Sequence, residues 1–304
     1  MNEDRKKIGA LTIYLFSVFI LGSLICPLLW ELIHSTALQK IDSIGDASFG
    51  KVCNRAFMLV AFVGLWPLAK QLNCTSKDDF GLAIPRKSFF KEFGMGFIFG
   101  AITLLCLALF FYFIELRILK SGPIDERIIK GIRKGIVTGI AVGLIEEIFF
   151  RGILTRILSR IGTLFMAILI SSTIYAAVHF IKGDSSTDYE VIHWYSGFIY
   201  LKSAFSLYSD PRFIGSFLTL LTVGIFLAAL TLKRGNIALA AGIHAGWVSI
   251  IKGNSNVTRT DLDSPHFWLV GNYDKFTGYA AFIWLALICI GTWIYLEKTK
   301  KRDA

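Results

Sequence analysis

Long apolar blocks constrain the fold of this chain more than any other feature of its sequence. A membrane-spanning helix needs about 20 mostly apolar residues, whereas a soluble domain of this size would show apolar stripes. Eight stretches qualify as candidates, at residues 10–33, 56–73, 93–116, 135–158, 163–182, 213–232, 236–252 and 277–296. We therefore predict an all-α polytopic membrane protein of about eight transmembrane helices, forming a single integral-membrane domain over residues 1–304.

The charges of the chain fit insertion into a lipid bilayer. The formal net charge is +10, and Lys and Arg beside apolar segments hold the spans in place by meeting anionic lipid headgroups. No basic run carries interleaved aromatic residues in a soluble segment, so we predict no nucleic-acid binding. The basic clusters at 5–7 and 298–302 favour both termini in the cytoplasm. We predict a location in the cell membrane.

Two adjacent glutamates, Glu146 and Glu147, lie within the fourth apolar block. An ionised side chain at mid-bilayer depth costs roughly 2.5–3.5 kcal/mol or more, so an acid there indicates a functional site. Glu147 and Arg151 are four residues apart and share a helix face, which predicts an ion pair. Glu146 points about 100° away and is predicted to face a cavity. The alternative is a polar helix end with a satisfied ion pair.

One histidine, His179, follows in the next apolar block. Tyr175 and His179 are four residues apart and share a helix face. A short turn near 160–163 joins this block to the previous one, and Glu146 and His179 are equidistant from its middle. In an antiparallel hairpin they are therefore expected to face each other at one depth, about 24 Å from the turn. A satisfied interfacial histidine is the alternative for His179.

A second histidine, His244, lies in a later apolar block beside small residues. Gly242, Ala245 and Gly246 permit close approach of a neighbouring helix. An interhelical hydrogen bond is the structural alternative to a functional role for His244.

Together these motifs resemble the CAAX protease and bacteriocin-processing family, also called CPBP or Abi, which includes endopeptidases related to CAAX prenyl endopeptidases. The shared pattern is Glu-Glu-x-x-x-Arg at 146–151, an aromatic-x-x-x-His at 175–179 and a histidine, His244, in a later span. The resemblance covers residues 136–251, which we take as the catalytic core.

The resemblance implies a hydrolase, an intramembrane endopeptidase of eight helices. It assigns water activation to Glu146, an assisting role to His179 and oxyanion stabilisation to His244, with Glu147 as a further catalytic residue. The expected partner is a membrane-associated peptide or protein substrate. Whether that substrate carries a prenylated C-terminus or a bacteriocin leader stays open.

Two positions depart from the family pattern. Tyr175 stands where the family usually has Phe, and Val248 replaces the Asn of a His-x-x-x-Asn motif. Because Val248 cannot donate a hydrogen bond, we predict that the Tyr175 hydroxyl supplies the missing oxyanion donor. The alternative is that Tyr175 packs like Phe. Arg151 and Tyr175 are thus predicted supporting residues.

Three alternatives stay open. Glu146, His179 and His244 are a set of residue types that could hold zinc with an open water position, but no His-x-x-x-His on one helix supports this. We therefore favour a metal-free glutamic endopeptidase without a cofactor. A proton-coupled transporter would also use Glu and His chains. A non-catalytic binding or immunity protein on the same scaffold would explain Val248.

Overall fold

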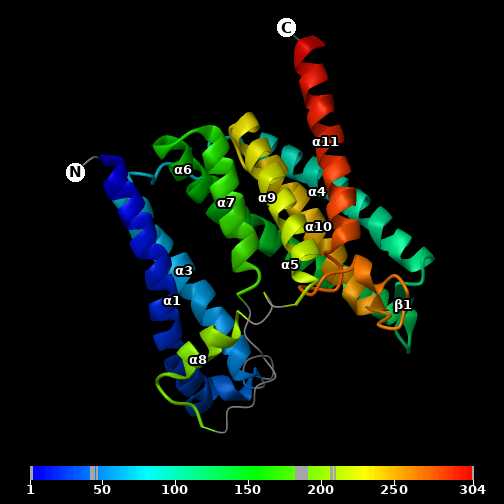
Figure 1. Cartoon of the computed structure of the whole chain (residues 1–304), viewed down its shortest axis with the longest axis horizontal. Helices are drawn as coiled ribbons and strands as arrows, with labels where there is room; N and C mark the ends of the chain where they lie inside the picture. The colour runs from blue at the N-terminus through cyan, green and yellow to red at the C-terminus, as the bar shows by residue number, and fades with distance from the viewer. Residues whose placement is uncertain are drawn as a thin grey trace. The chain divides into compact units, whose positions relative to one another are not determined.

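The computed structural model describes residues 3–41, 45, 47–181, 191–205, 208 and 210–302. The chain forms two compact units. The first unit is Met1–Thr75 with Ala177–Pro211, and the second is Ser76–Ala176 with Arg212–Ala304. Among the described residues, the regular structure is helical apart from one two-stranded sheet (Figure 1). The predicted all-α class is therefore confirmed.

The first unit is built on a pair of long helices. Its elements are α1 (Glu3–Ser35), η1 (Ala37–Lys40), α3 (Phe49–Gln71) and α8 (Ser196–Ser203). α1 packs along α3, and α8 packs against α1. The buried core between them contains Cys26, Phe49, Cys53, Ala56 and Tyr200.

The second unit carries the remaining elements. They are α4 (Arg86–Phe113), β1 (Arg117–Leu119), α5 (Ile124–Glu147), η2 (Ile148–Leu154), α6 (Thr155–Ile161), α7 (Leu164–Val178), α9 (Phe213–Arg234), α10 (Ala238–Val257), β2 (Thr258–Thr260), η4 (Phe267–Leu269) and α11 (Tyr279–Arg302). The last two residues of α7 belong to the first unit. β1 and β2 are antiparallel, with Arg117 opposite Thr260.

α10 lies against both α4 and α5, and small residues let the three backbones approach closely (Figure 1). Methyl groups added at Gly242 or Gly246 would collide with the α4 carbonyls of Phe93 and Phe97. On the other side, a Cβ at Gly143 of α5 would lie 2.8 Å from the backbone nitrogen of Ala245. The close approach predicted around His244 is confirmed, and it fixes the direction in which α10 presents that histidine.

Thr103 of α4 accepts hydrogen bonds from tryptophans of α10 and α11. Its hydroxyl accepts a hydrogen bond from the indole of Trp247 in α10 at 3.1 Å, and its carbonyl accepts one from Trp284 in α11 at 2.9 Å. Thr103 and Trp247 are both buried. One polar residue in α4 thus satisfies indole N–H groups from two other helices.

The predicted number of eight spans is not confirmed. Among the described residues, four helices are long and apolar enough to cross a membrane, and two are apolar but shorter. The four are Lys6–Ser35, Phe49–Gln71, Arg86–Phe113 and Phe213–Arg234, and the shorter ones are Leu164–Val178 and Tyr279–Tyr295. The predicted spans 135–158 and 236–252 fall short for different reasons. α5 begins with a charged half before η2 interrupts it, and the end of α10 is polar.

Candidate active site

The helix that carries the two glutamates widens immediately after them. Glu146 and Glu147 end α5, and the next turns, η2, form a π-helix. Its five-residue spacing is visible at Thr155, whose amide and hydroxyl both donate to the carbonyl of Phe150, the hydroxyl at 2.8 Å. π turns are rare and often accompany functional sites.

Glu147 is the buried centre of the polar cluster. Its side chain is fully buried, and its Oε1 accepts a hydrogen bond from Arg151 Nη1 at 2.7 Å. The predicted pair between Glu147 and Arg151 therefore forms. The same Oε1 lies 2.8 Å from Nδ1 of His244. Glu147 Oε2 and Arg151 Nη2 are buried without a hydrogen-bond partner among the described residues.

His244 lies between the two carboxylates. A carboxylate oxygen accepts hydrogen bonds, so the contact with Glu147 is a hydrogen bond in the tautomer that has the proton on Nδ1 of His244. The other ring nitrogen, Nε2, is 3.8 Å from Oε2 of Glu146. That distance is too long for a direct hydrogen bond. Glu146 is also the more open of the two acids, since its side chain is 27% exposed whereas that of Glu147 is buried.

Aromatic rings enclose the guanidinium of Arg151. The ring of Tyr175 lies 4.4 Å from Arg151 Cζ, and that of Phe150 lies 5.8 Å from it. Tyr175 also meets the His244 ring edge-on, with centroids 6.2 Å apart. Cation–π attraction in a desolvated site adds to the ion pair with Glu147. The predicted supporting residues Arg151 and Tyr175 are therefore both part of the cluster.

The other predicted residues have different positions in the chain. His179 directly follows the last helical residue of α7 and is partly buried, but it belongs to the first unit. Its expected approach to Glu146 stays a prediction. Val248 lies on α10, one turn after His244, and is partly buried.

Tyr273 was not identified from the sequence. It lies in the loop before α11, outside every motif. Burial raises the pKa of the Tyr273 phenol, and the negative charges of Asp274 and Glu146 raise that pKa further. The phenol is therefore within electrostatic range of Glu146. No local signal in the sequence marks this residue, because the loop reaches the cluster only through the fold.

A polar loop at 76–81 contacts η2 and α6, the helical segments that follow the two glutamates. The carboxylate of Asp79 accepts hydrogen bonds from the Ser76 amide at 2.8 Å, from the Ser76 hydroxyl at 2.6 Å and from Arg160 of α6. Burial alone would raise the pKa of Asp79, but these hydrogen bonds and the Arg160 charge outweigh burial and lower that pKa. Gly152 of η2 has no side chain to separate it from the loop, and a Cβ there would lie 2.6 Å from the Phe80 carbonyl oxygen.

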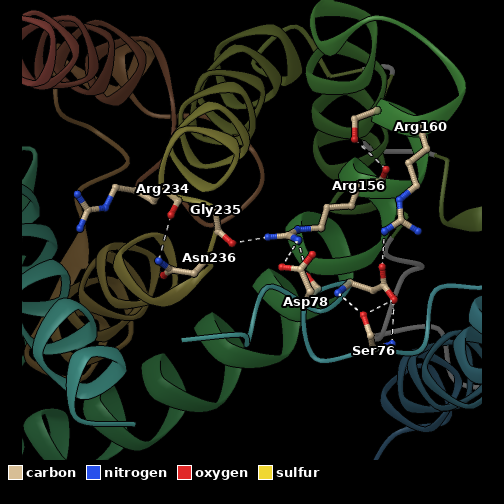
Figure 2. A network of polar contacts seen from close by, with 9 residues as sticks. Ser76, Asp78, Arg156, Arg160, Arg234, Gly235 and Asn236 are labelled. Atoms are coloured by element: carbon tan, nitrogen blue, oxygen red, sulfur yellow. Dashed lines mark hydrogen bonds and ion pairs between the residues drawn. The ribbon is translucent and has the colours of Figure 1, made fainter. Parts of the chain in front are cut away.

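Arg156 connects the same loop to the start of α10. Its guanidinium lies between Asp78 and Gly235, as Figure 2 shows, donating to the Asp78 carboxylate at 3.3 Å and to the Gly235 carbonyl at 2.6 Å. Ile237 adds a backbone bond to the Gly81 carbonyl at 3.1 Å. These contacts join α6, which directly follows η2, to the residues that precede α10.

No metal-binding set of three or more His, Cys, Asp and Glu side chains is found in the part of the chain that the structure describes. His244 has a carboxylate at each ring nitrogen. The zinc alternative with Glu146, His179 and His244 would draw on residues of both units. The metal-free form stays a prediction.

The fold and the cluster define a helical membrane protein with a buried Glu–His–Arg site. Residues 130–250 match the family model described as type II CAAX prenyl endopeptidase, Rce1-like. This part of the chain is therefore similar to the CAAX protease family, whose members are membrane proteases, and the match supports membership of that family. Searches of the curated proteins and of the solved structures gave no match.

Proposed function

We propose that the chain is an intramembrane endopeptidase that hydrolyses a peptide bond in a membrane-associated peptide or protein, with Glu146 activating the water. The observation that supports this is the cluster around His244. One ring nitrogen is 2.8 Å from the buried acid, Glu147, and the other is 3.8 Å from the more open acid, Glu146. Two carboxylates in unlike surroundings are the usual basis for separating catalytic roles.

In the proposed reaction, Glu146 takes a proton from water as the water oxygen attacks the scissile carbonyl carbon. The electron pair of the carbonyl moves to its oxygen, and Nε2 of His244 donates to that oxyanion. Donation requires protons on both ring nitrogens, because the Glu147 carboxylate at Nδ1 only accepts. The Glu146 proton then passes to the leaving amine as the peptide bond breaks. Glu147 and Arg151 act by positioning His244.

The decisive experiment compares wild-type protein with Glu146→Gln in detergent, using a peptide that ends in a prenylated CAAX sequence and one that does not. The amide cannot take the water proton, so cleavage should fall by at least about 100-fold. Glu115→Gln, an exposed position outside the cluster, is the matched control and should cleave normally. His179→Ala should be nearly as severe as Glu146→Gln. Cleavage by Glu146→Gln at the wild-type rate would remove the glutamate mechanism.

The same assay separates the alternatives. Loss of activity with a chelator and recovery with zinc would support zinc held by Glu146, His179 and His244. Wild-type protein that binds the peptides without cleaving them would favour a non-catalytic binding protein. Transport of a solute coupled to protons would favour the carrier.

We further propose that Tyr175 supplies the oxyanion donor that Val248 lacks. The support is that the Tyr175 ring is buried against the His244 ring. Tyr175→Phe keeps the cation–π contact with Arg151, so folding should persist while turnover falls by about 10²–10³. Val248→Asn in that background should recover part of the loss. Wild-type turnover in Tyr175→Phe would mean that Tyr175 only packs like Phe.

A further inference from the structure

The start of α5 carries a cationic hollow that the proposed peptidase reaction does not use. The hollow has a volume of about 290 Å³ and is lined by Lys120, Pro123, Glu126, Arg127, Lys130 and Asn256. Three of these side chains are cations and one is a carboxylate. Arg127 is about 28 Å from Glu146 along the helix axis, at 1.5 Å per residue. The hollow is therefore separate from the candidate active site.

Two of the cations are held in place by the backbone around them. Lys120 Nζ donates to the carbonyl of Ser255 at 2.6 Å, which anchors it to the end of α10. Arg127 donates through Nη2 to the carbonyl of Ser121. Gly122 has a φ of +106°, and a Cβ there would lie 3.2 Å from Arg127 Nη2. The loop thus adopts a glycine-specific conformation where the guanidinium rests on it.

Arg127 keeps an unused donor. Its Nε is buried and has no hydrogen-bond partner among the described residues. A buried donor of a charged group is costly when it is unpaired, so an acceptor is expected there. The surrounding cations favour an acceptor with negative charge.

Apolar side chains flank the hollow on the same helix. Ile124, Ile128 and Ile132 follow at four-residue spacing and are 47%, 42% and 58% exposed. Residues at this spacing lie on one side of a helix. Exposed isoleucines beside Lys and Arg are the pattern of a helix at the surface of a membrane, where apolar side chains meet acyl chains and cations meet headgroups. A ligand with a charged head and a hydrocarbon tail fits both features.

We propose that this hollow binds the headgroup of an anionic phospholipid, with Arg127 and Lys130 contacting the phosphate and the isoleucines contacting the acyl chains. The negative charge of Glu126 limits the negative charge of the ligand that the hollow can accept. Its carboxylate opposes a multiply charged group, which favours a phosphodiester with one negative charge, such as phosphatidylglycerol, over inorganic phosphate.

The test uses full-length protein in neutral detergent and measures the thermal unfolding midpoint during titration with phosphatidylglycerol, phosphatidylcholine or inorganic phosphate. Phosphatidylglycerol should raise the wild-type midpoint, and the other two should not. Each cation near an anionic lipid contributes about fivefold in affinity, so Arg127→Gln/Lys130→Gln should need about 30-fold more phosphatidylglycerol. Arg133→Gln/Lys134→Gln, on α5 but outside the hollow, should respond like wild type.

Three outcomes would overturn the proposal. Equal weakening in both double variants would mean diffuse surface charge without a site. An equal response to phosphatidylcholine would mean that the headgroup charge is irrelevant. An equal response to inorganic phosphate would mean a free-phosphate site instead of a lipid site. If the double variant does not fold, the exposed Lys130→Gln change and native mass spectrometry of retained phosphatidylglycerol serve instead, with fewer lipids expected per protein. None of these readouts depends on peptide cleavage.

Discussion

Replacing Glu147 by glutamine should destabilise the protein because it leaves the charge of Arg151 without its counterion. The side chains of Arg151 and Glu147 are 1% and 0% exposed, so water cannot replace the lost carboxylate. Glutamine keeps the size of glutamate and an acceptor oxygen, so the change removes charge with little change in volume. The same substitution also weakens the hold on His244 at Nδ1.

The magnitude follows from the surroundings of the guanidinium. Breaking a buried ion pair by removing one partner costs about 3–5 kcal/mol. The cation–π contact with Tyr175 at 4.4 Å persists in the variant and offsets part of this cost. We therefore expect about 3 kcal/mol. The midpoint shifts by roughly 2–4 °C per kcal/mol for chains of 150–250 residues and by less for longer ones, so for these 304 residues it should fall by about 6 °C.

The assay is thermal unfolding of the purified protein in one detergent, with two comparison variants. Glu92→Gln removes the carboxylate from a pair whose arginine, Arg234, is 40% exposed, so it should cost less than about 1 kcal/mol. Glu147→Gln combined with Arg151→Met removes the buried charge while keeping an acceptor for His244, and it should recover most of the lost stability. A Glu147→Gln midpoint equal to that of Glu92→Gln would refute the reasoning, because Arg151 would then not be an uncompensated charge.

Three further predictions concern the scaffold. Folding lowers the pKa of Asp79, so the stability that its carboxylate contributes is present above the unfolded pKa of about 3.9 and is lost as pH falls through the folded pKa. As pH is lowered from about 5 to about 2, the unfolding midpoint of Asp79→Asn should therefore fall less steeply than that of the wild type. Gly143→Ala should lower the unfolding midpoint because its methyl group would lie 2.8 Å from a backbone nitrogen of α10. The control, Gly94→Ala, has nothing within 4 Å and should raise the midpoint because alanine favours helix more than glycine does. Equal effects of the two changes would mean that α5 and α10 are not in backbone contact. Thr103→Val leaves the buried indole N–H of Trp247 unpaired and should cost about 1–3 kcal/mol, measured by denaturant unfolding followed by tryptophan fluorescence; an unchanged stability would mean that the indole finds another acceptor.

Local spacing predicted the parts of the site that depend on one helix. Glu147 and Arg151 pair as residues four apart should. Tyr175 lies on α7, and the family pattern, not its spacing from Arg151, singled it out. The contact between His244 and Glu147 joins residues far apart in the chain, so periodicity could not show which acid each ring nitrogen meets. Tyr273 was missed for the same reason.

Segment boundaries were harder to predict than segment type. The apolar block at 135–158 includes the place where α5 gives way to a π-helix, and no hydrophobic pattern marks that change of pitch. The charged first half of α5 is also regular helix. A search for apolar stretches therefore could not show that this helix begins before residue 135. The expected depth of His179 relied on ideal hairpin geometry and stays a prediction.

The close packing of α10 between α4 and α5 has a consequence for how a peptide enters the site. The backbone of α10 contacts neighbouring backbones on both sides, so sliding or rotating this helix would break packing contacts with α4 and α5. His244 therefore lies on a helix that is tightly packed on two sides. For the proposed peptidase we therefore expect any movement around a bound substrate to involve other segments, and a crosslink that joins α10 to α4 should leave turnover intact.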